Sequence, residues 1–282
     1  MANESTSSTL SELYTEIVAE AQFVASEQSI MKPLVRNYAI AGGGKAVEIP
    51  KYSAVSAAAV SEASDLSNTA IDPTSVTITA SEVGIMTTLT DLGRNSAPRN
   101  VAADIGRLFG EAIARKQDTD LTALFDGFSG AIGDGTAAIT AAKVFAAASD
   151  LRTASLNLNE CAVVLHPKIA YDLKANLTNT FANSNANDLA NEALRSGYVG
   201  QLAGLRIFET TNMSNTGNTG DYKGAAFHRD ALAMAEMKGL SIETQRDASL
   251  RADEIVATAV YGVGEIHDSY GVEIQGDSSI VS

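Results

Sequence analysis

Three histidines and one cysteine are the side chains in this sequence best suited to metal binding or nucleophilic catalysis. His166, His228 and His267 are far apart along the chain, and their spacings do not match the close pairs that place two imidazoles on one metal ion. Cys161 lies inside the apolar run CAVVL, where a thiol usually packs as a small hydrophobic group. Because it is the only cysteine, it also cannot form an intrachain disulfide. We therefore expect no metal site, no cofactor site and no catalytic thiol.

The stretch SGYVGQLAGLRIFETTNM, residues 196–213, raises the question of a phosphate-binding loop because it contains Gly197, Gly200 and Gly204. A dinucleotide-binding loop needs a strand, then closely spaced glycines, then a helix whose amides bind the phosphates. Here polar sequence precedes the glycines, and the apolar residues after them predict a strand. No Gly-Lys-Ser/Thr sequence follows. We therefore predict that these glycines form turns.

Two further candidates for chemistry are weak. Residues 127–135, GFSGAIGDG, predict a glycine-rich turn, and Ser129 within it lacks the spacing of a nucleophile elbow. Asn218 and Asp221, in the segment SNTGNTGDYKG, have side chains that could bind calcium, but the composition favours a plain exposed loop. Carboxylates are abundant, and the sequence alone does not bring two of them to a catalytic separation. An enzyme with an unrecognised carboxylate site therefore stays as an alternative.

The charge balance restricts the partners of the chain. The 282 residues include 34 Asp and Glu against 20 Lys and Arg, which gives a formal net charge of −14. Proteins that hold nucleic acid tightly do so with clustered Lys and Arg, so we expect no tight or sequence-specific DNA binding. An acidic wall around DNA, or simple solubility, agrees with this charge.

Neither a membrane nor secretion is indicated by the sequence. The longest strongly apolar run is CAVVL, which is far too short to span a bilayer. The N-terminal residues have no Lys or Arg before Lys32 and lack the basic and apolar parts of a signal peptide. We expect the protein to stay where it is made.

Two alternating runs flank a segment that is poor in large apolar side chains. KAVEIPKY predicts one strand and SVTITASEVGIMTTLTD predicts a second β region. Residues 53–73 between them carry only four large apolar side chains, Val55, Val60, Leu66 and Ile71. Burial of so few groups within the chain cannot offset the entropy of ordering the segment. We therefore predict a projecting loop, with these four residues as the candidate subunit contacts.

Two helices are predicted in the first half of the chain. Residues 9–25 have apolar side chains at helical spacing, with Glu12, Glu16 and Glu20 on one face. The longest predicted helix covers residues 98–125 and begins at Pro98. We expect its core-facing side to consist of Val101, Ile105, Leu108 and Ala112. A stripe of alternating charge should face solvent or another subunit, and it comprises Asp104, Arg107, Glu111, Arg115 and Asp118.

The second half of the chain predicts a mixture of helices and strands. A helix is expected over residues 141–154, a strand over 161–165 and another helix from Pro167. Three alternating runs near the C-terminus, LSIETQRD, EIVATAVYGVGEIH and GVEIQG, predict a β region. The fold class is therefore α+β.

The order of these elements resembles the major capsid proteins of tailed bacteriophages, which have the Hong Kong ninety-seven type of fold. The resemblance covers almost the whole chain. It rests most on LHPKIAYDLKANL, GYVGQLAGLRIFETTNM and residues 224–274, which begin GAAFHRDALAMAEMKGL. Each motif is common alone, and the specificity lies in their order and spacing.

The resemblance implies a division of the chain into the parts of a capsid subunit. Residues 1–45 would form an N-terminal arm, 46–92 the extended loop, and 93–150 the spine helix and peripheral domain. Residues 151–225 would form the axial domain, and 226–282 would return to the peripheral and axial β regions. Some family members cross-link a loop lysine to an asparagine on a neighbour. Lys45 and Lys51 lie near the base of the predicted loop, so we do not expect that cross-link here.

The function implied by the resemblance is that of a structural protein without catalytic activity. Such a subunit assembles with itself as hexamers and pentamers into an icosahedral shell that encloses double-stranded DNA. Its partners would be a scaffolding protein, a portal and a decoration protein, and assembly would occur in the bacterial host cytoplasm. An encapsulin-like shell around a cargo enzyme has the same fold and is the nearest alternative.

Overall fold

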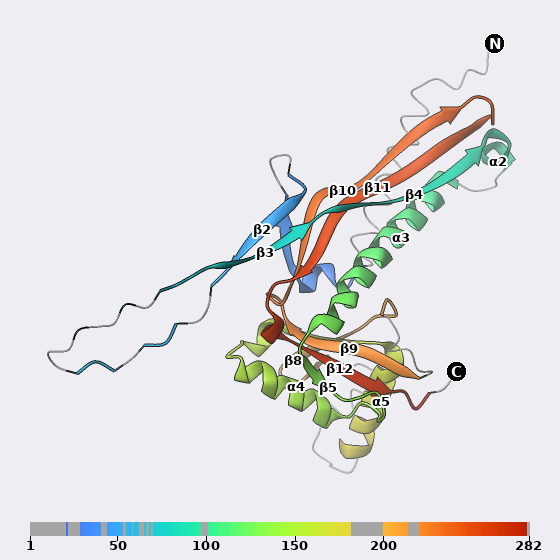
Figure 1. Ribbon diagram of the computed structural model, residues 1–282. Helices are drawn as coiled ribbons and strands as arrows, with labels where there is room; N and C mark the ends of the chain where they lie inside the picture. The colour runs from blue at the N-terminus through green and yellow to red at the C-terminus, as the bar shows by residue number, and fades with distance from the viewer. Residues whose placement is uncertain are drawn as a thin grey trace.

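A long helix sets the axis of the molecule. In the computed structural model, α3 runs over Val101–Ala123, within the predicted span, and continues as a 3-10 turn over Leu124–Gly127. The structure describes residue 21 and residues 29–40, 44–52, 70–96, 101–181, 200–213 and 220–280, together with residues 55–57, 59–61, 65 and 68. The molecule is elongated, with a long sheet along α3, a compact unit at one end and a projecting hairpin (Figure 1).

The buried face of α3 differs from the predicted one. Phe109, Ile113, Ala114 and Leu121 are buried, at successive steps of four, one and seven residues, as expected of a helix that covers a core with one stripe. Leu108, which was predicted to face the core, is 61% exposed. Apolar residues occur on two overlapping stripes of this helix, and the stripe with the large Phe109 ring is the one that packs on the sheet.

Asp118 is a second correction on α3. It was predicted to belong to a solvated or subunit-facing charged stripe, but it is completely buried. Its carboxylate accepts hydrogen bonds from the Ser29 hydroxyl at 2.9 Å and from the backbone amides of Ile30 and Met31 at 3.1 Å each. A buried carboxylate is tolerated when its lone pairs are satisfied in this way. Asp118 therefore fixes the segment at residues 29–31 against the helix.

The long sheet lies along α3. Its strand order is β1-β10-β11-β4, and the strands are β1 Arg36–Ala39, β10 Leu232–Asp247, β11 Ala252–Glu265 and β4 Ser81–Thr90. β1 pairs with β10 in parallel, whereas β11 pairs antiparallel with both β10 and β4. The face toward α3 buries Ile242, Ile255 and Ala257 against Phe109. The alternating runs predicted from the C-terminal sequence thus form a sheet.

The compact sheet forms the other end of the body. Its strand order is β5-β12-β9-β6-β8-β7, and the strands are β5 Gly130–Ile132, β12 Gly271–Asp277, β9 Asp221–His228, β6 Cys161–Leu165, β8 Leu205–Glu209 and β7 Gln201–Leu202. Helices α4, Ala141–Thr153, and α5, Pro167–Phe181, supply Val144, Leu151, Ile169 and Leu173 to its core. Both helices were predicted from the sequence.

Two segments that were predicted as a turn and a loop are strands. Gly130–Ile132, predicted as part of a turn, is a strand that pairs with β12, and residues 221–224 of a predicted loop belong to β9. Both segments are recruited by strands more than 45 residues away, which local composition does not reveal. The predicted helix at residues 9–25 lies outside the described residues, apart from the helical, buried Ala21. Gly204 has a φ of +88° between β7 and β8, as expected of a turn glycine, whereas Gly197 is not described.

Candidate subunit-contact site

The hairpin of β2 and β3 positions the loop that carries the predicted contact residues. β2 covers Ala46–Lys51 and β3 covers Thr74–Thr79, and they pair antiparallel. The two runs alternate apolar and polar side chains, so one face of the hairpin can pack on the body. Ile49 and Ile78 are buried there against Ala233 and Ala235 of β10.

Glycines on β11 allow the hairpin base to approach the long sheet. A Cβ atom at Gly262 would lie 2.4 Å from the backbone oxygen of Thr79, and one at Gly264 would lie 2.9 Å from a side-chain carbon of Ile78. Because no side chain fits at these distances, the two glycines are needed for this contact. The hairpin base is therefore held rigidly while the loop beyond it leaves the body.

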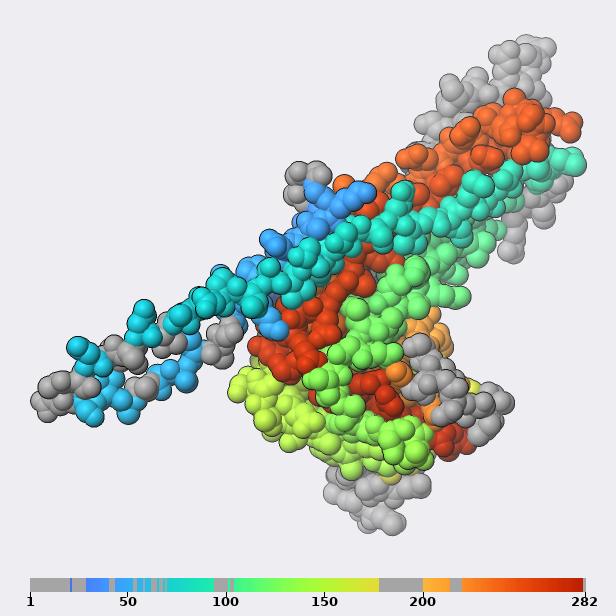
Figure 2. Space-filling view, viewed as in Figure 1, coloured from blue at the N-terminus to red at the C-terminus, as the bar shows by residue number. Residues whose placement is uncertain are grey.

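The loop presents its apolar side chains to solvent. Val55 is 58% exposed, Val60 53% and Ile71 56%, and Tyr52 beside them is also exposed. Figure 2 shows the loop extending from the body as a thin arm. Leu66, the fourth predicted contact residue, lies outside the described residues. The other three residues thus lie exposed on one segment that projects beyond the hairpin.

A second group of exposed apolar residues lies at the outer end of the long sheet and was missed in the sequence. Leu92 in α2, Asp91–Ser96, is exposed, as is Leu250 in the turn between β10 and β11. The available signal was a leucine in the middle of the turn between two alternating runs, where a large apolar side chain has no core to enter. These residues and the loop lie at opposite ends of the molecule (Figure 1).

The cysteine and two of the histidines considered for catalysis or metal binding are buried or stacked against neighbouring aromatic rings. Burial, together with the nearby Glu160, raises the pKa of the Cys161 thiol to about 11, so the thiolate is scarce at neutral pH. His166 stacks on Tyr222 with 4.1 Å between ring centres, and His267 stacks on Tyr270 at 4.4 Å. Burial lowers the pKa of both imidazoles. Within the described part of the chain, no group of three or more His, Cys, Asp or Glu side chains could hold a metal ion.

Ion pairs join the elements at the junction of the two sheets. The Lys223 ammonium lies 2.6 Å from Asp126 and 3.2 Å from the buried Glu273. The Tyr261 hydroxyl donates to Asp120 at 2.8 Å, and burial and this bond raise the tyrosine's pKa. These contacts tie the end of α3 to β9, β11 and β12.

Among the described residues, no helix is both long and apolar enough to cross a membrane.

The arrangement of a spine helix, a long sheet and a projecting hairpin has counterparts among known proteins. A family model described as phage capsid protein matches residues 73–272. This chain belongs to the phage capsid protein family. The match runs from β3 to the first residues of β12 and so includes α3 and most of both sheets. The comparison with curated proteins finds no match.

Solved structures confirm the capsid fold. The capsid of the cyanophage P-SCSP1u superposes on this capsid protein with a TM-score of 0.73 at 18% identity, and the match covers 89% of each chain. A chain from Mycobacterium phage Che8 gives 0.67 at 25% identity and covers 82% of this chain and 84% of its own. The capsid of a native GTA particle gives 0.68 at 12% identity, with coverage of 89% and 91%. The predicted α+β capsid fold is thus confirmed.

Proposed function

We propose that this phage capsid protein assembles with itself, as hexamers and pentamers, into an icosahedral shell that encloses the phage's double-stranded DNA. The observation that carries the proposal is the loop at residues 53–73, whose Val55, Val60 and Ile71 are exposed on a segment that leaves the body. Exposed apolar groups on an extended arm have no role in folding their own chain. They are suited to contacts with neighbouring copies.

The elements can be assigned to the parts of a capsid subunit. Of residues 46–92, which the resemblance implies as the extended loop, the hairpin of β2 and β3 with the segment between them would be that loop. β4 lies in the long sheet, which with α3 would form the spine and peripheral domain. The compact sheet with α4 and α5 would be the axial domain. We place its start near Gly130, ahead of the boundary at residue 151 expected from the sequence, because β5 and α4 pack in the compact unit.

The proposal includes partners and a location. A scaffolding protein would guide assembly in the bacterial host cytoplasm, and a portal and a decoration protein would join the shell. The subunit would enclose DNA without sequence-specific binding and would act without catalysis. Membership of a phage capsid family favours this shell over an encapsulin-like compartment and over an enzyme with a carboxylate site.

Replacing residues 53–73 with a short Gly/Ser linker tests the proposal. The fold should survive, because the deleted segment contributes little to the core and shortening a loop costs little entropy. Assembly should fail, because the contacts between chains are lost. Expression with the scaffolding partner, followed by electron microscopy and thermal melting of the variant and the parent, measures both effects. Many weak contacts of about 4 kcal/mol each are sufficient for a stable lattice.

Two results would contradict this account. A parent protein that is folded yet strictly monomeric under every assembly condition would exclude the shell function. A loop variant that builds normal shells, or that melts far below the parent, would exclude the loop as the subunit contact.

A further inference from the structure

Lys223 contacts two carboxylates at the point where the end of α3 meets the compact sheet. Its Nζ atom lies 2.6 Å from Asp126 Oδ1 and 3.2 Å from Glu273 Oε1. Asp126 belongs to the 3-10 turn that continues α3, whereas Lys223 lies on β9 and Glu273 on β12. Figure 1 shows these elements meeting at the lower end of α3. Three separate segments thus place one amine between two carboxyl groups.

The site is enclosed on the side of Glu273 and open on the side of Asp126. The side chains of Glu273 and Lys223 are 7% and 17% exposed, whereas that of Asp126 is 51% exposed. Glu273 Oε1 lies within ion-pair distance of Nζ, yet it accepts no well-directed hydrogen bond from the described part of the chain. A buried polar atom left in this state calls for an explanation, and a role in proton transfer is one. Its lone pair is free to accept a proton.

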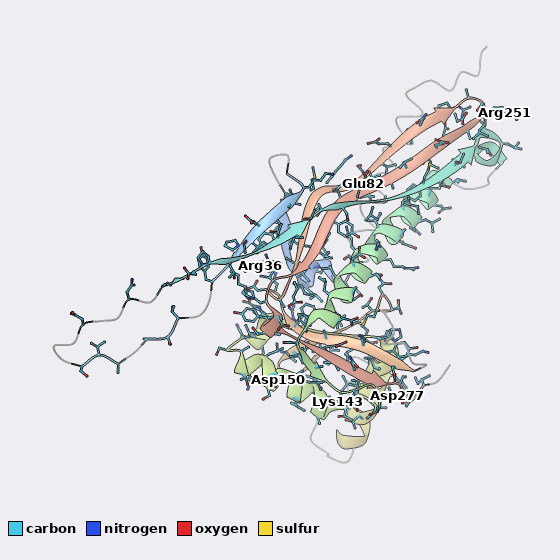
Figure 3. The ribbon with its side chains drawn as sticks, viewed as in Figure 1. Arg36, Glu82, Lys143, Asp150, Arg251 and Asp277 are labelled. Atoms are coloured by element: carbon cyan, nitrogen blue, oxygen red, sulfur yellow. The ribbon has the colours of Figure 1, made fainter. Side chains whose placement is uncertain are left out.

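A second ion pair of the chain provides a comparison. Lys116 lies 2.6 Å from Asp120 on the outer surface of α3, and within the described part of the chain Asp120 is its one ion-pair partner. Lys143, labelled in Figure 3 at the lower end of the compact unit, donates instead to the Ala137 carbonyl oxygen at 3.0 Å. Contact between a lysine and one carboxylate is thus ordinary, and the buried second carboxylate distinguishes the site at Lys223.

The Lys223 ammonium has to lose a proton before its nitrogen can react. Burial alone would lower its pKa, but the hydrogen bonds with Asp126 and Glu273 outweigh burial and the pKa is raised. Lys223 therefore rests as an ammonium, and a neutral amine forms when one proton moves to Glu273. An amine held against a carboxyl group reacts at a high effective concentration, because no encounter between separate molecules is needed. A slow reaction is sufficient, since it occurs once in each chain.

We propose that Lys223 and Asp126 join in an isopeptide bond within each subunit, with Glu273 as the proton carrier. After the proton moves to Glu273, the Nζ lone pair attacks Asp126 Cγ and forms the C–N bond. Glu273 passes protons from the nitrogen to one carboxyl oxygen, and the bond between that oxygen and Cγ breaks. Two of the three ammonium protons leave with the oxygen as water, and the third stays on the amide nitrogen. Ammonium and carboxylate thus become an amide and water without another reactant, and Glu273 ends ionised as it began.

The bond ties the end of α3 to the compact unit. Asp126 and Lys223 lie 97 positions apart, so the bond closes a long loop. A cross-link of this kind stabilises a fold chiefly by restricting the unfolded chain, as a disulfide does. The inference goes beyond the proposed shell function and does not depend on it, because both residues belong to one chain and need no neighbour.

The intact mass under denaturing conditions is the direct test. The parent should be lighter than its sequence by one water molecule, and a digest should contain a branched peptide that carries Asp126 and Lys223. Lys223→Arg keeps the charge but has no lysine amine to form the bond, so it should have the full mass. Its melting temperature should fall by about 10 °C, because the loop is no longer closed. Lys116→Arg is the matched control and should keep the loss of water.

Glu273→Gln separates proton transfer from placement of the two reacting groups. Glutamine keeps the size of the side chain but cannot carry the proton, so the linked fraction of freshly purified protein should fall at least about tenfold. Circular dichroism verifies that the variant is folded. The inference would be overturned by a parent with the full mass of its sequence, by equal linked fractions in Glu273→Gln and the parent, or by an equally abundant branched peptide at Lys116 and Asp120. Each of these results leaves the shell function intact, because particle counts from the parent test that function separately.

Discussion

At the scale of single residues, Asp118 shows how one buried charge organises the chain. It holds residues 29–31 to α3 through bonds from one hydroxyl and two amides. We expect Asp118→Asn to lower the free energy of unfolding by about 2–3 kcal/mol, because an amide accepts at one oxygen only and points N–H groups at donors. Urea denaturation measures the change. Asp104→Asn, at an exposed position of the same helix, should change stability by less than about 0.5 kcal/mol, and equal effects would refute the assigned role.

His166 predicts a dependence of stability on pH. Burial and then the nearby Lys168 charge lower the pKa of its imidazole, and its Nδ1 accepts the Lys168 amide at 3.3 Å. In the unfolded chain the pKa returns to about 6.5. Below that pH the unfolded state binds a proton that the folded state resists, so stability falls as the pH drops through 6.5 toward the folded pKa. Thermal melts from pH 8 to pH 5 should show this fall, and His166→Asn should reduce it. An unchanged pH profile in the variant would contradict the role of His166.

At the scale of elements, the periodicity of apolar residues predicted most of the helices and strands, but it did not always predict which face of an element is buried. The alternation in KAVEIPKY and in the C-terminal runs was sufficient to identify β2, β10 and β11, because each strand has one buried face. Gly130–Ile132 has no such pattern, and it becomes a strand only because β12 lies beside it. Of the predicted contact residues, Val55, Val60 and Ile71 are exposed as a loop requires. The exposed Leu250 could be suspected from its place in a turn, but its neighbour Leu92 lies about 160 residues away in the chain, and no local pattern encodes that proximity.

The buried and the exposed face of α3 should respond differently to a charged substitution. Leu121 is completely buried among Phe125, Phe227 and Met234, whereas Leu108 is exposed. Leu121→Asp places an unpaired charge in the core and should cost more than about 4 kcal/mol, which abolishes folding. Leu108→Asp should leave the melting curve nearly unchanged. Circular dichroism melts of the two variants compare the faces directly, and loss of the fold in Leu108→Asp would show that this face is buried after all.

At the scale of the whole molecule, the net negative charge is suited to a protein that encloses DNA without binding it tightly. The chain carries 34 acidic and 20 basic side chains, and several of the basic ones are already paired, as Lys32 is with Glu236 and Arg36 with Asp230. Few cations remain to displace the counterions of a duplex, and the excess negative charge repels the phosphates. The interior of a shell built from such subunits would let packaged DNA slide without adhering.

The corresponding prediction is weak DNA binding by the isolated subunit. A short duplex titrated in physiological salt should bind with a dissociation constant weaker than about 100 μM, and binding should not depend on sequence. Fluorescence anisotropy measures this directly. Lowering the salt concentration tenfold should strengthen binding only slightly, because the slope of affinity against salt counts the phosphates that basic side chains neutralise. Submicromolar binding with a steep salt slope would mean that a basic surface grips the DNA, and the acidic-wall account would then be wrong.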